Sequence, residues 1–494
     1  MNRESMRTRL DATREPWDVL VIGGGATGLG CALDAAARGF RTVLVEARDF
    51  AAGTSSRSTK LFHGGVRYLR GGHVQLVAQS LREREHVRHH AAGLVRDMAF
   101  LVPAYGLAER FYFSAGLRLY DVLSRAGAAD RSHAVSRDEA LRLCPTLQPR
   151  GLRGGVIYHD LQFDDARFAM ELARAAAARE AVLLNYAGVE ELMIARGRVE
   201  GVVVRDAARG DTLSIRARVV INAAGVFADE IRRLARPQAA PMLRFSRGAH
   251  IVLDNSFLGG ETAVLVPRTD DDRVVFVIPW RGHVLVGTTD TPVDTPDHDP
   301  SATADDVNFL IEHAARYLMH APGRHDVKSA FAGLRPLPAE KGRTANVRRD
   351  HRVEVAGGMV TICGGKWTTY RLMAHDAVDA AAKEGALASR PDTRAESLGA
   401  PPAANARLEE QIVAGDALDA DDVAEITRIA RDEMALTVED VLARRTRALF
   451  LDARRSVAAA RVVAETMAGV SGRDAAWIEH EVESFAALAD RYSV

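Results

Sequence analysis

The sequence predicts an α/β protein with three parts: a Rossmann-like nucleotide-binding domain built from several segments, an inserted antiparallel-sheet domain and a C-terminal helical domain. Three stretches predict the first part. Residues 17–46 have the pattern of strand, tight turn, helix and strand, and the stretches at 217–229 and 357–381 each run from an apolar strand into glycine. Alternating residues around 181–215 and 249–290 predict the strands of the antiparallel sheet, and helical spacing toward the C-terminus predicts the helical domain.

The first stretch has the features of a dinucleotide site. Its apolar strand "DVLVI" ends at a GxGxxG turn, in which the first glycine permits the turn, the second admits a pyrophosphate and the third lets helix and strand pack closely. Phosphates would lie at the helix N-terminus, where free N–H groups favour negative charge. The second strand ends at Glu46, whose carboxylate suits ribose hydroxyls and disfavours a 2′-phosphate, so the ligand is expected to be an adenine dinucleotide other than NADP. The expected contacts in the turn are Gly23, Gly24, Gly25, Ala26, Thr27 and Gly28.

The arrangement of these stretches favours FAD over NAD. The GxGxxG turn lies close to the N-terminus, and the two later stretches look like further pieces of the same nucleotide domain, with other residues inserted between them. In the last of them, Gly364 and Gly365 open a helix, so the backbone there could reach the ribityl chain or the pyrimidine edge of a flavin. A domain assembled in this way predicts FAD.

Composition limits the other possibilities. The 494 residues are 47% hydrophobic and 27% charged, with a net charge of −1, which gives no reason to expect a nucleic-acid partner. Cys31, Cys144 and Cys363 are far apart in the sequence, so neither a disulfide framework nor a metal site is expected. No apolar run reaches the roughly 18 residues that cross a bilayer, and the N-terminus lacks the apolar core of a signal peptide. A cytoplasmic protein is expected, either in solution or on a membrane surface.

A basic stretch follows the first nucleotide segment. "SSRSTKLFHGGVRYLR" places Lys60, His63, Arg67 and Arg70 around a double glycine. On a helix, side chains at this spacing share one face. The pattern fits either a solvated basic face or a local anion site beside backbone that a ligand can approach.

These stretches resemble flavin-dependent glycerol-3-phosphate dehydrogenases of the membrane-associated type, within the wider group of FAD oxidoreductases that includes glycine and D-amino-acid oxidases. The more specific matches are "STKLFHGGVRYL", "GLRPL" and "GGKWTTYR", and the other matches are "VIGGGATGLG", "RGAHIVL", "VFVIPW", "VGTTD" and "VRRDH". The resemblance implies FAD as cofactor and oxidation of sn-glycerol 3-phosphate to dihydroxyacetone phosphate, by hydride transfer from C2 to FAD. It also implies that the electrons pass to a membrane quinone.

The resemblance implies roles for several residues at the substrate. A doubly charged phosphate needs charge-assisted hydrogen-bond donors, preferably from arginine. The resemblance assigns this role to Arg335 and Arg349, and it places Arg67 beside them in the active-site region. Arg335 is also expected among the catalytic residues. The proton of the C2 hydroxyl needs a base with a pKa near the working pH, and His250 is favoured slightly over His63 for this role.

Further residues are expected at the flavin. Lys366 and the helix N-terminus after the double glycine would stabilise the anionic reduced ring, one of the ways in which protein groups tune a flavin. Hydroxyl groups are expected to contribute at the ring edge and at the diphosphate. Thr368 and Thr369, beside Lys366, would supply hydroxyl donors. Thr54, Ser55 and Ser56, before the basic stretch, would contact the FAD diphosphate or the edge of the isoalloxazine ring.

Segment bounds follow from these assignments. The FAD-binding domain is expected to comprise residues 17–90, 150–240 and 330–385, and the substrate-capping domain residues 91–149 and 241–329. A linker rich in proline and alanine at 386–406 is expected before the helical domain at 407–494, which could aid dimerisation or membrane docking.

Residues 104–127 predict a basic amphipathic helix, because aromatic, aliphatic and arginine residues alternate there at helical spacing. Such a helix either lies in a membrane interface or packs on the substrate domain. The first alternative places the protein at the inner face of the cell membrane, where a quinone could take its electrons.

Three other functions stay open from the sequence. Oxygen could replace the quinone as electron acceptor, or an amine or amino-acid oxidase could use the same fold. A flavin-binding redox sensor would have no turnover at all. Several motif-matched arginines favour a phosphate, since the carboxylate of an amino acid needs only one.

Overall fold

The structure is a computed structural model of the chain. It describes residues 1–70, 72–124, 127, 130–270, 273–339, 350–388, 398–399 and 404–494, without the side chains of Arg67, Arg70 and Ala404. Arg349, expected at the substrate phosphate, therefore lies outside the described residues. Of Arg67, only the backbone is described, in helix α3 (Val66–Arg70).

The first sheet has a parallel core. Strand β1 (Trp17–Ile22) lies between β10 (Asp211–Asn222) and β2 (Thr42–Val45), and helix α2 (Ala26–Ala37) connects β1 to β2. The middle of β1 is fully buried, as expected for a strand covered on both faces. The other strands of this sheet are β7 (Val182–Leu184), β8 (Ala187–Ala195), β9 (Arg198–Asp206), β17 (His351–Ala356) and β18 (Met359–Gly364). The main order is β17-β18-β10-β1-β2-β7, and β8 and β9 extend it as a meander from β10.

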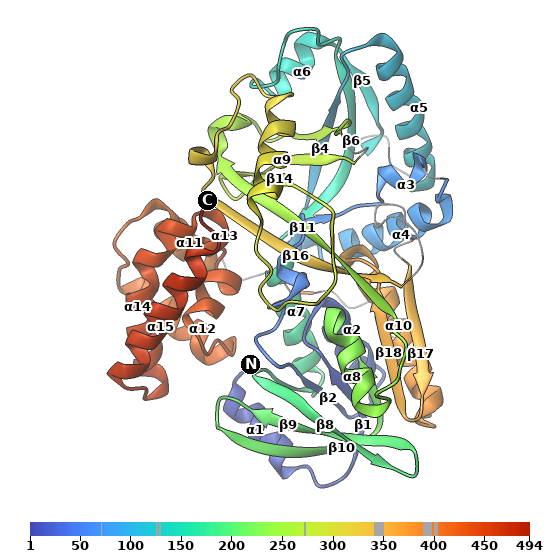
Figure 1. Ribbon diagram of the computed structural model, residues 1–494, viewed down its shortest axis with the longest axis vertical. Coiled ribbons are helices and arrows are strands. Elements are labelled where there is room, and N and C mark those ends of the chain that lie inside the picture. The colour runs from blue at the N-terminus through green and yellow to red at the C-terminus, as the bar shows by residue number, and fades with distance from the viewer. Residues whose placement is uncertain are drawn as a thin grey trace.

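The second sheet is mostly antiparallel and lies above the first in Figure 1. Its strands are β3 (Leu61–Phe62), β4 (Val95–Pro103), β5 (His133–Val135), β6 (Gly155–Phe163), β11 (Leu243–Asp254), β12 (Ala263–Val266), β13 (Val275–Trp280), β14 (His283–Gly287), β15 (Thr291–Val293) and β16 (Ser329–Pro338). The main order is β15-β11-β14-β13-β12-β4-β6-β3, with β16 beside β11 and β5 beside β6.

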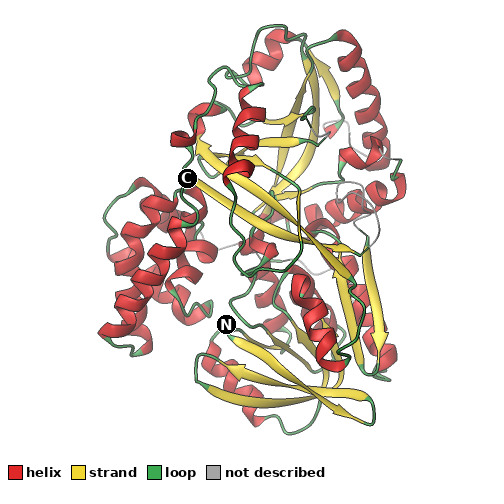
Figure 2. Ribbon diagram, viewed as in Figure 1, coloured by secondary structure: helices red, strands yellow, loops and turns green. Residues whose placement is uncertain are grey.

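Helices cover both sheets (Figure 2). Helices α7 (Asp165–Ala178) and α10 (Tyr370–Glu384) pack on α2. The remaining helices of these two parts are α1 (Arg3–Ala12), α4 (Val74–His90), α5 (Leu107–Ser124), α6 (Arg137–Leu143), α8 (Ala228–Ala235) and α9 (Ala304–Ala315). Across the described ranges, no helix combines the length and the apolar composition that a membrane span requires.

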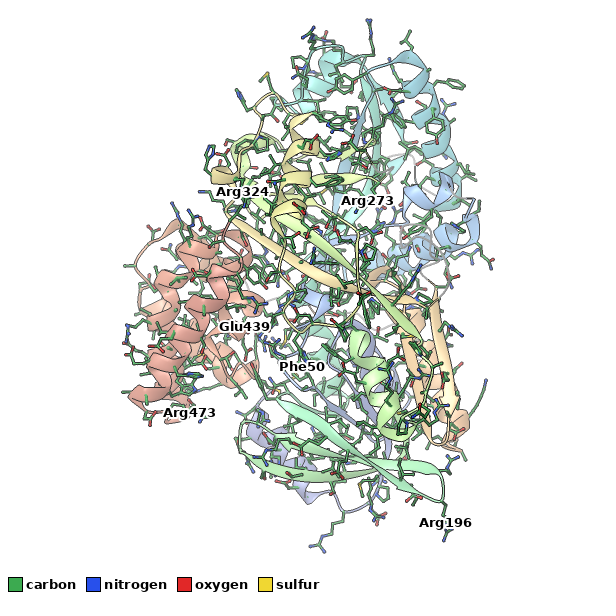
Figure 3. All side chains as sticks on the ribbon, in the orientation of Figure 1. Phe50, Arg196, Arg273, Arg324, Glu439 and Arg473 are labelled. Atoms are coloured by element: carbon green, nitrogen blue, oxygen red, sulfur yellow. The ribbon has the colours of Figure 1, made fainter. Side chains whose placement is uncertain are left out.

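The C-terminal part is a bundle of helices at one side of both sheets (Figure 1). It contains α11 (Ala404–Ala414), α12 (Ala420–Asp432), a π-helical turn (Asp440–Arg445), α13 (Ala448–Leu451), α14 (Ala453–Ser471) and α15 (Ala475–Asp490). Figure 3 shows Arg196 and Arg473 at outer tips of the molecule and Glu439 near the junction of the bundle with the first sheet. At this junction the Glu439 carboxylate lies 3.6 Å from Arg48, which follows β2.

These parts confirm the predicted fold class. Some segments differ from the expectations. The strands around 181–215 extend the first sheet, because β9 pairs with β10, and do not join the second sheet. Strands β6 and β16 lie in the second sheet, although the expected bounds placed them in the nucleotide domain, because β6 pairs with β4 and β16 with β11.

Candidate active site

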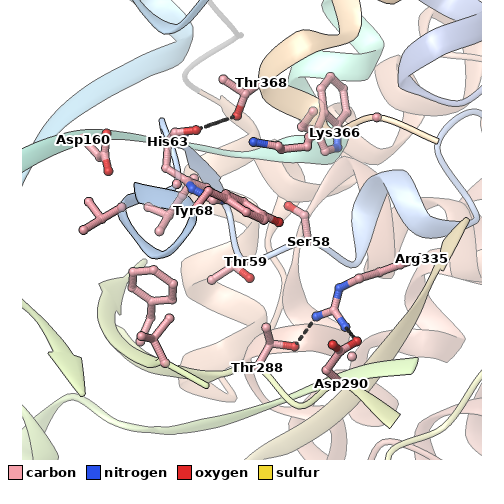
Figure 4. Close-up of a pocket in the computed structure, with 18 of the residues that line it drawn as sticks. Ser58, Thr59, His63, Tyr68, Asp160, Thr288, Asp290, Arg335, Lys366 and Thr368 are labelled. Atoms are coloured by element: carbon pink, nitrogen blue, oxygen red, sulfur yellow. Dashed lines mark hydrogen bonds and ion pairs between the residues drawn. The ribbon is translucent and has the colours of Figure 1, made fainter. Parts of the chain in front are cut away.

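A cavity of about 550 Å³ lies where the two sheets meet (Figure 4). Its walls come from the start of α2, the loop after Thr54, helix α5 and strands β11, β16 and β18. The predicted site residues that line it are Gly25, Ala26, Thr27, Thr54, Ser55, His63, His250, Arg335, Gly364, Gly365, Lys366 and Thr368. The predicted residues that are described but do not line it are Gly23, Gly24, Gly28, Glu46, Ser56 and Thr369.

The first glycine turn packs too closely for side chains. Gly23 has a φ of 108°, and a Cβ atom there would lie 2.6 Å from the carbonyl oxygen of Ala223. A Cβ atom on Gly28 would lie 1.8 Å from the Gly23 oxygen. These two glycines let β1, α2 and β10 approach one another, while Gly25 brings the N-terminus of α2 to the cavity wall.

Glu46, directly after β2, braces this turn. Its carboxylate accepts hydrogen bonds from the backbone N–H groups of Gly24, at 2.6 Å, and Arg48, at 2.8 Å. Burial raises the pKa of Glu46, and the two backbone donors oppose that rise. The contact with a ribose stays a prediction.

The short turn at Thr54–Ser56 joins three walls of the cavity. The Ser55 hydroxyl oxygen accepts a hydrogen bond from the N–H of Ala26 at 2.9 Å, and the Ser55 carbonyl accepts one from the Trp367 indole at 2.9 Å. The Thr54 hydroxyl donates to the carbonyl of Leu334 at 2.6 Å. The turn therefore ties α2 to β16 and to the segment that follows β18.

The second glycine turn carries a cation. Gly364 and Gly365 have φ values of 82° and 71°, which favour glycine, and a Cβ atom on Gly365 would lie 2.2 Å from the Met373 sulfur. Lys366 Nζ donates to the Ser80 hydroxyl at 3.0 Å and lies over the Tyr68 ring, 4.8 Å from its centre. Its charge is therefore fixed at the cavity wall.

Thr368 connects the second glycine turn to the basic stretch. Its hydroxyl oxygen lies 3.3 Å from both the backbone nitrogen and the carbonyl oxygen of His63. The Thr369 hydroxyl points elsewhere and donates to the Lys366 carbonyl at 3.3 Å. Thr369 thus stabilises the turn, whereas Thr368 lies at the cavity.

Arg335 enters the cavity from β16 (Figure 4). Its Nη1 donates to the carbonyl of Thr289 at 3.0 Å and to the carboxylate of Asp290 at 3.1 Å. Its Nη2 donates to the Thr288 hydroxyl at 2.9 Å. Gly248, on the paired strand β11, leaves room for the guanidinium, since a Cβ atom there would lie 2.2 Å from Nη2. The guanidinium is therefore fixed in place, with part of its charge balanced by Asp290.

His250 projects from β11 and is only 2% exposed. Its Nε2 lies 2.9 Å from the Thr59 hydroxyl, and its ring stacks on Phe331 with centroids 5.0 Å apart. A Cβ atom on Gly287, in the neighbouring strand, would lie 2.1 Å from the imidazole. The ring is thus held between two neighbouring strands, and His250 lines the cavity.

The double glycine of the basic stretch is held by a buried network. The N–H of Gly64 donates to the Tyr120 hydroxyl at 2.7 Å, and that hydroxyl donates to Asp160 at 2.7 Å. Arg84 donates to the same carboxylate oxygen at 2.7 Å. A Cβ atom on Gly64 would lie 2.6 Å from the Tyr120 oxygen, which explains the glycine. The network fixes the backbone beside His63, the second candidate base.

Sequence reasoning missed part of the cavity wall. A solvated basic face is wrong for Lys60, which is fully buried. The match "STKLFHGGVRYL" contains Ser58, Thr59 and Tyr68, but nothing in its pattern assigned them to the cavity. The stretch "VGTTD" could have been read as a signal for Thr288 and Asp290. The residues missed at the wall include Ser58, Thr59, Tyr68, Asp160, Thr288 and Asp290, together with Tyr112, Phe113, Leu117 and Leu119 of α5.

Comparison with protein families assigns the chain to a family. Residues 18–379, more than half of the chain, match the family described as FAD dependent oxidoreductase. The chain belongs to this family. Residues 360–477 of this oxidoreductase also match the family described as C-terminal domain of alpha-glycerophosphate oxidase.

Individual relatives of the oxidoreductase have one name in common. Glycerol-3-phosphate dehydrogenase 2 of Mycobacterium tuberculosis is 39% identical, and the match covers 96% of this chain and 88% of the relative. Mitochondrial glycerol-3-phosphate dehydrogenases of Arabidopsis thaliana and Homo sapiens are 43% and 39% identical over 76% and 79% of this chain. The match spans only 62% and 56% of the length of these two relatives.

Solved structures show the same fold. The glycerol-3-phosphate dehydrogenase from Bacillus halodurans, complexed with FAD, has a TM-score of 0.80 and 29% identity, and the match covers 100% of this chain and 98% of that one. The glycine oxidase from Geobacillus kaustophilus has a TM-score of 0.56 and 20% identity over 78% of this chain and 99% of that one, which shows the fold alone.

FAD is the cofactor of the family, and the cavity of this oxidoreductase fits it. A Cβ atom on Gly25 would lie 3.0 Å from the Ser55 hydroxyl. Without that atom, the backbone at the start of α2 stays accessible to a ligand. Gly364, Gly365 and the cation of Lys366 line the same cavity. The start of α2 suits the diphosphate of FAD, and the glycine pair with Lys366 suits the anionic reduced ring. Among the residues that the structure describes, no cluster of three or more His, Cys, Asp or Glu side chains could hold a metal ion.

Proposed function

We propose that this oxidoreductase oxidises sn-glycerol 3-phosphate to dihydroxyacetone phosphate. One observation carries the proposal: a fixed guanidinium, Arg335, and a buried imidazole, His250, line one cavity together with both glycine turns. A phosphate-bearing secondary alcohol needs a cation for its phosphate and a proton acceptor for its hydroxyl. The names of the relatives support the same substrate.

Arg335 is proposed to hold the phosphate. Because Asp290 balances part of its charge, a dianion needs a further cation, and Arg273 lines the same cavity. Arg67 and Arg349 stay proposed phosphate ligands on the basis of the sequence. Together, these groups suit a dianion better than the single carboxylate of an amino acid.

His250 is proposed as the base that accepts the proton of the C2 hydroxyl. Burial lowers the pKa of His250 well below its usual range, and the positive charges of Lys60 and Arg335 lower it further. The imidazole is therefore neutral and has a free electron pair for the proton, although its pKa lies below the value near the working pH that the sequence argument expected of the base. His63, which lines the same cavity, is the alternative base.

FAD, when bound, supplies the acceptor for the hydride that leaves C2 of the substrate. The N–H groups of Gly25 and Thr27 at the start of α2 would hold its diphosphate, and Ser55, which accepts from the N–H of Ala26, lies beside them. Lys366 would stabilise negative charge at the ring edge, and the Thr368 hydroxyl lies on the same segment.

Helix α5 supports a membrane quinone as electron acceptor. Leu107, Phe111 and Val122 are apolar and yet 73%, 78% and 74% exposed. Tyr112 and Leu119 of the same helix are exposed and also line the cavity. The helix thus connects an apolar outer surface with the cavity wall, which suits a lipid-soluble acceptor that arrives from a membrane. The proposed location is the inner face of the cell membrane.

Anaerobic addition of glycerol 3-phosphate to the FAD-loaded protein tests the proposed reaction. The absorbance of the oxidised flavin should disappear. Unchanged absorbance would contradict every dehydrogenase version and favour a flavin-binding sensor. Bleaching by glycine or a D-amino acid, but not by glycerol 3-phosphate, would assign an amino-acid oxidase.

A second measurement tests the acceptor. Turnover with a soluble quinone analogue is compared with peroxide release in air at the same substrate concentration. Faster turnover with the quinone is expected, and peroxide release at an equal or higher rate would assign oxygen as the acceptor.

A further inference from the structure

Three buried charged side chains meet behind the cavity, from distant parts of the chain. Lys60 follows the turn at Thr54–Ser56, Asp165 begins α7, and Arg447 precedes α13 of the C-terminal bundle. Lys60 and Asp165 are 0% exposed, and Arg447 is 1% exposed. Lys60 Nζ lies 2.7 Å and Arg447 Nη2 lies 3.2 Å from the Asp165 carboxylate. Because pairing at best repays the cost of burying such charges, stability alone explains this cluster poorly.

The cluster fixes both ends of a short backbone turn. The Ser56 carbonyl accepts hydrogen bonds from Lys60 Nζ and from Arg447 Nη2, each at 2.7 Å. The Asp165 carboxylate accepts hydrogen bonds from the N–H and the hydroxyl of Ser58, at 3.0 and 2.7 Å. The backbone of Lys60 has a φ of 62°, a conformation that costs free energy in residues other than glycine and must be held by its surroundings.

The turn presents Thr59 to the proposed base. Thr59 lies between two anchored residues, Ser58 and Lys60, and its hydroxyl lies 2.9 Å from His250 Nε2. The other ring nitrogen of His250 is buried and has no hydrogen-bond partner among the described residues. Within the described part of the chain, the Thr59 hydroxyl is therefore the polar contact that orients the imidazole.

The same part of the bundle also supports the ring on which His250 lies. His250 stacks on Phe331, and Phe331 packs against Phe450 of α13 with centroids 4.7 Å apart. The Arg447 guanidinium lies 4.2 Å from the centre of the Phe450 ring, and Lys60 Nζ lies 5.4 Å from the centres of both phenylalanine rings. Two contact paths thus lead from the bundle to His250, one through Thr59 and one through Phe331.

We infer that Arg447 is a positioning residue of the active site, so that the C-terminal bundle takes part in catalysis. Arg447 does not line the cavity. It acts through Ser56 and Asp165 on Thr59, and through Thr59 on His250. This role rests on the proposed function, in which His250 accepts the proton of the substrate.

The test compares Arg447→Gln with a matched control, Arg445→Gln. Arg445 belongs to the same segment and is also buried, but it binds Asp49, at 2.6 Å, and the Glu433 carbonyl, at 2.8 Å, away from the Ser56 carbonyl. The measurement is the anaerobic rate of flavin bleaching at saturating glycerol 3-phosphate, per bound FAD, together with the KM and the melting temperature.

Arg447→Gln should lower the bleaching rate about tenfold to a hundredfold, the cost expected for a displaced catalytic group, with KM unchanged. Arg445→Gln should keep the wild-type rate per bound FAD, even where it lowers the melting temperature. A wild-type rate in Arg447→Gln overturns the inference. Equal losses in the two variants also overturn it, because a merely structural role predicts that result.

A second pair of variants serves if Arg447→Gln does not fold. Arg447→Lys keeps a cation with fewer donors, and Thr59→Val removes the hydroxyl that contacts His250 while keeping the side-chain shape. Each should lower the bleaching rate. The double variant Arg447→Lys/Thr59→Val should lose no more than Thr59→Val alone, because lysine keeps a cation beside the Phe450 ring, so that only the path through Thr59 is lost. Additive losses overturn the inference. Absence of bleaching in the wild type would refute the proposed function itself. Failure of the proposed function can therefore be distinguished from failure of the inference about Arg447.

Discussion

Replacing Arg335 with alanine should weaken binding of the phosphate substrate and leave FAD in place. The guanidinium lies in the cavity, held by the Thr288 hydroxyl at 2.9 Å and the Asp290 carboxylate at 3.1 Å. Loss of a charge-assisted hydrogen bond to a phosphate costs about 1.5–3 kcal/mol. Because about 1.4 kcal/mol corresponds to a factor of ten, the KM should rise about 10- to 150-fold.

Asp290 makes a second contribution to this effect. Its side chain is 4% exposed, and in Arg335→Ala it would face the substrate without the neighbouring cation. The repulsion between carboxylate and phosphate should add to the loss. The double variant Arg335→Ala/Asp290→Asn should therefore bind the substrate more tightly than Arg335→Ala alone.

The assay compares glycerol 3-phosphate with glycerol, which lacks the phosphate. Initial rates are measured at full FAD occupancy, checked from the visible spectrum. Arg335→Ala should lower kcat/KM for glycerol 3-phosphate far more than for glycerol, and Arg335→Lys should fall between it and the wild type. A wild-type KM for glycerol 3-phosphate in Arg335→Ala, or equal losses with both substrates, would show that Arg335 does not hold the phosphate.

Three further predictions concern the base, the cofactor and the membrane. Because burial lowers the pKa of His250 well below its usual range, flavin reduction should not slow as the pH falls from neutral to slightly acidic. A rate that falls with the pH over this range, and that is lost in His63→Asn but kept in His250→Asn, would assign the base to His63. Gly365→Ala should lose FAD on purification, because its φ of 71° disfavours alanine and the added Cβ atom would collide with a buried side chain; a full complement of FAD would contradict this. Phe111→Ser/Val122→Ser should reduce co-sedimentation with lipid vesicles without changing turnover with a soluble quinone analogue, and unchanged co-sedimentation would remove α5 from the proposed membrane surface.

Much of the nucleotide fold could be predicted from the sequence, because its features are local. Gly23 and Gly28 stand where a side chain would collide with neighbouring backbone, and the apolar run of β1 precedes them directly. The glycine pair after β18 has positive φ at both residues. Such positions restrict the residue type strongly, so their pattern is visible in a single sequence.

The partners of the site residues could not be predicted in the same way. Thr59 and His250 are 191 residues apart, and Arg335 and Asp290 are 45 apart. The register of β11 against β14 and β16 decides that Gly287 leaves room for His250 and that Gly248 leaves room for Arg335. No local propensity specifies a strand register of this kind, because it depends on the packing of whole sheets.

By itself, then, the sequence determined the positions of the glycine turns, the buried strands and the arginine and histidine side chains available for chemistry. Backbone conformation and apolar periodicity depend on neighbouring residues, so they can be inferred along the chain. Only the tertiary structure decided which of those side chains share the cavity and how they are charged. The lowered pKa of His250 arises from burial and from the charges of Lys60 and Arg335, which long-range packing brings beside it.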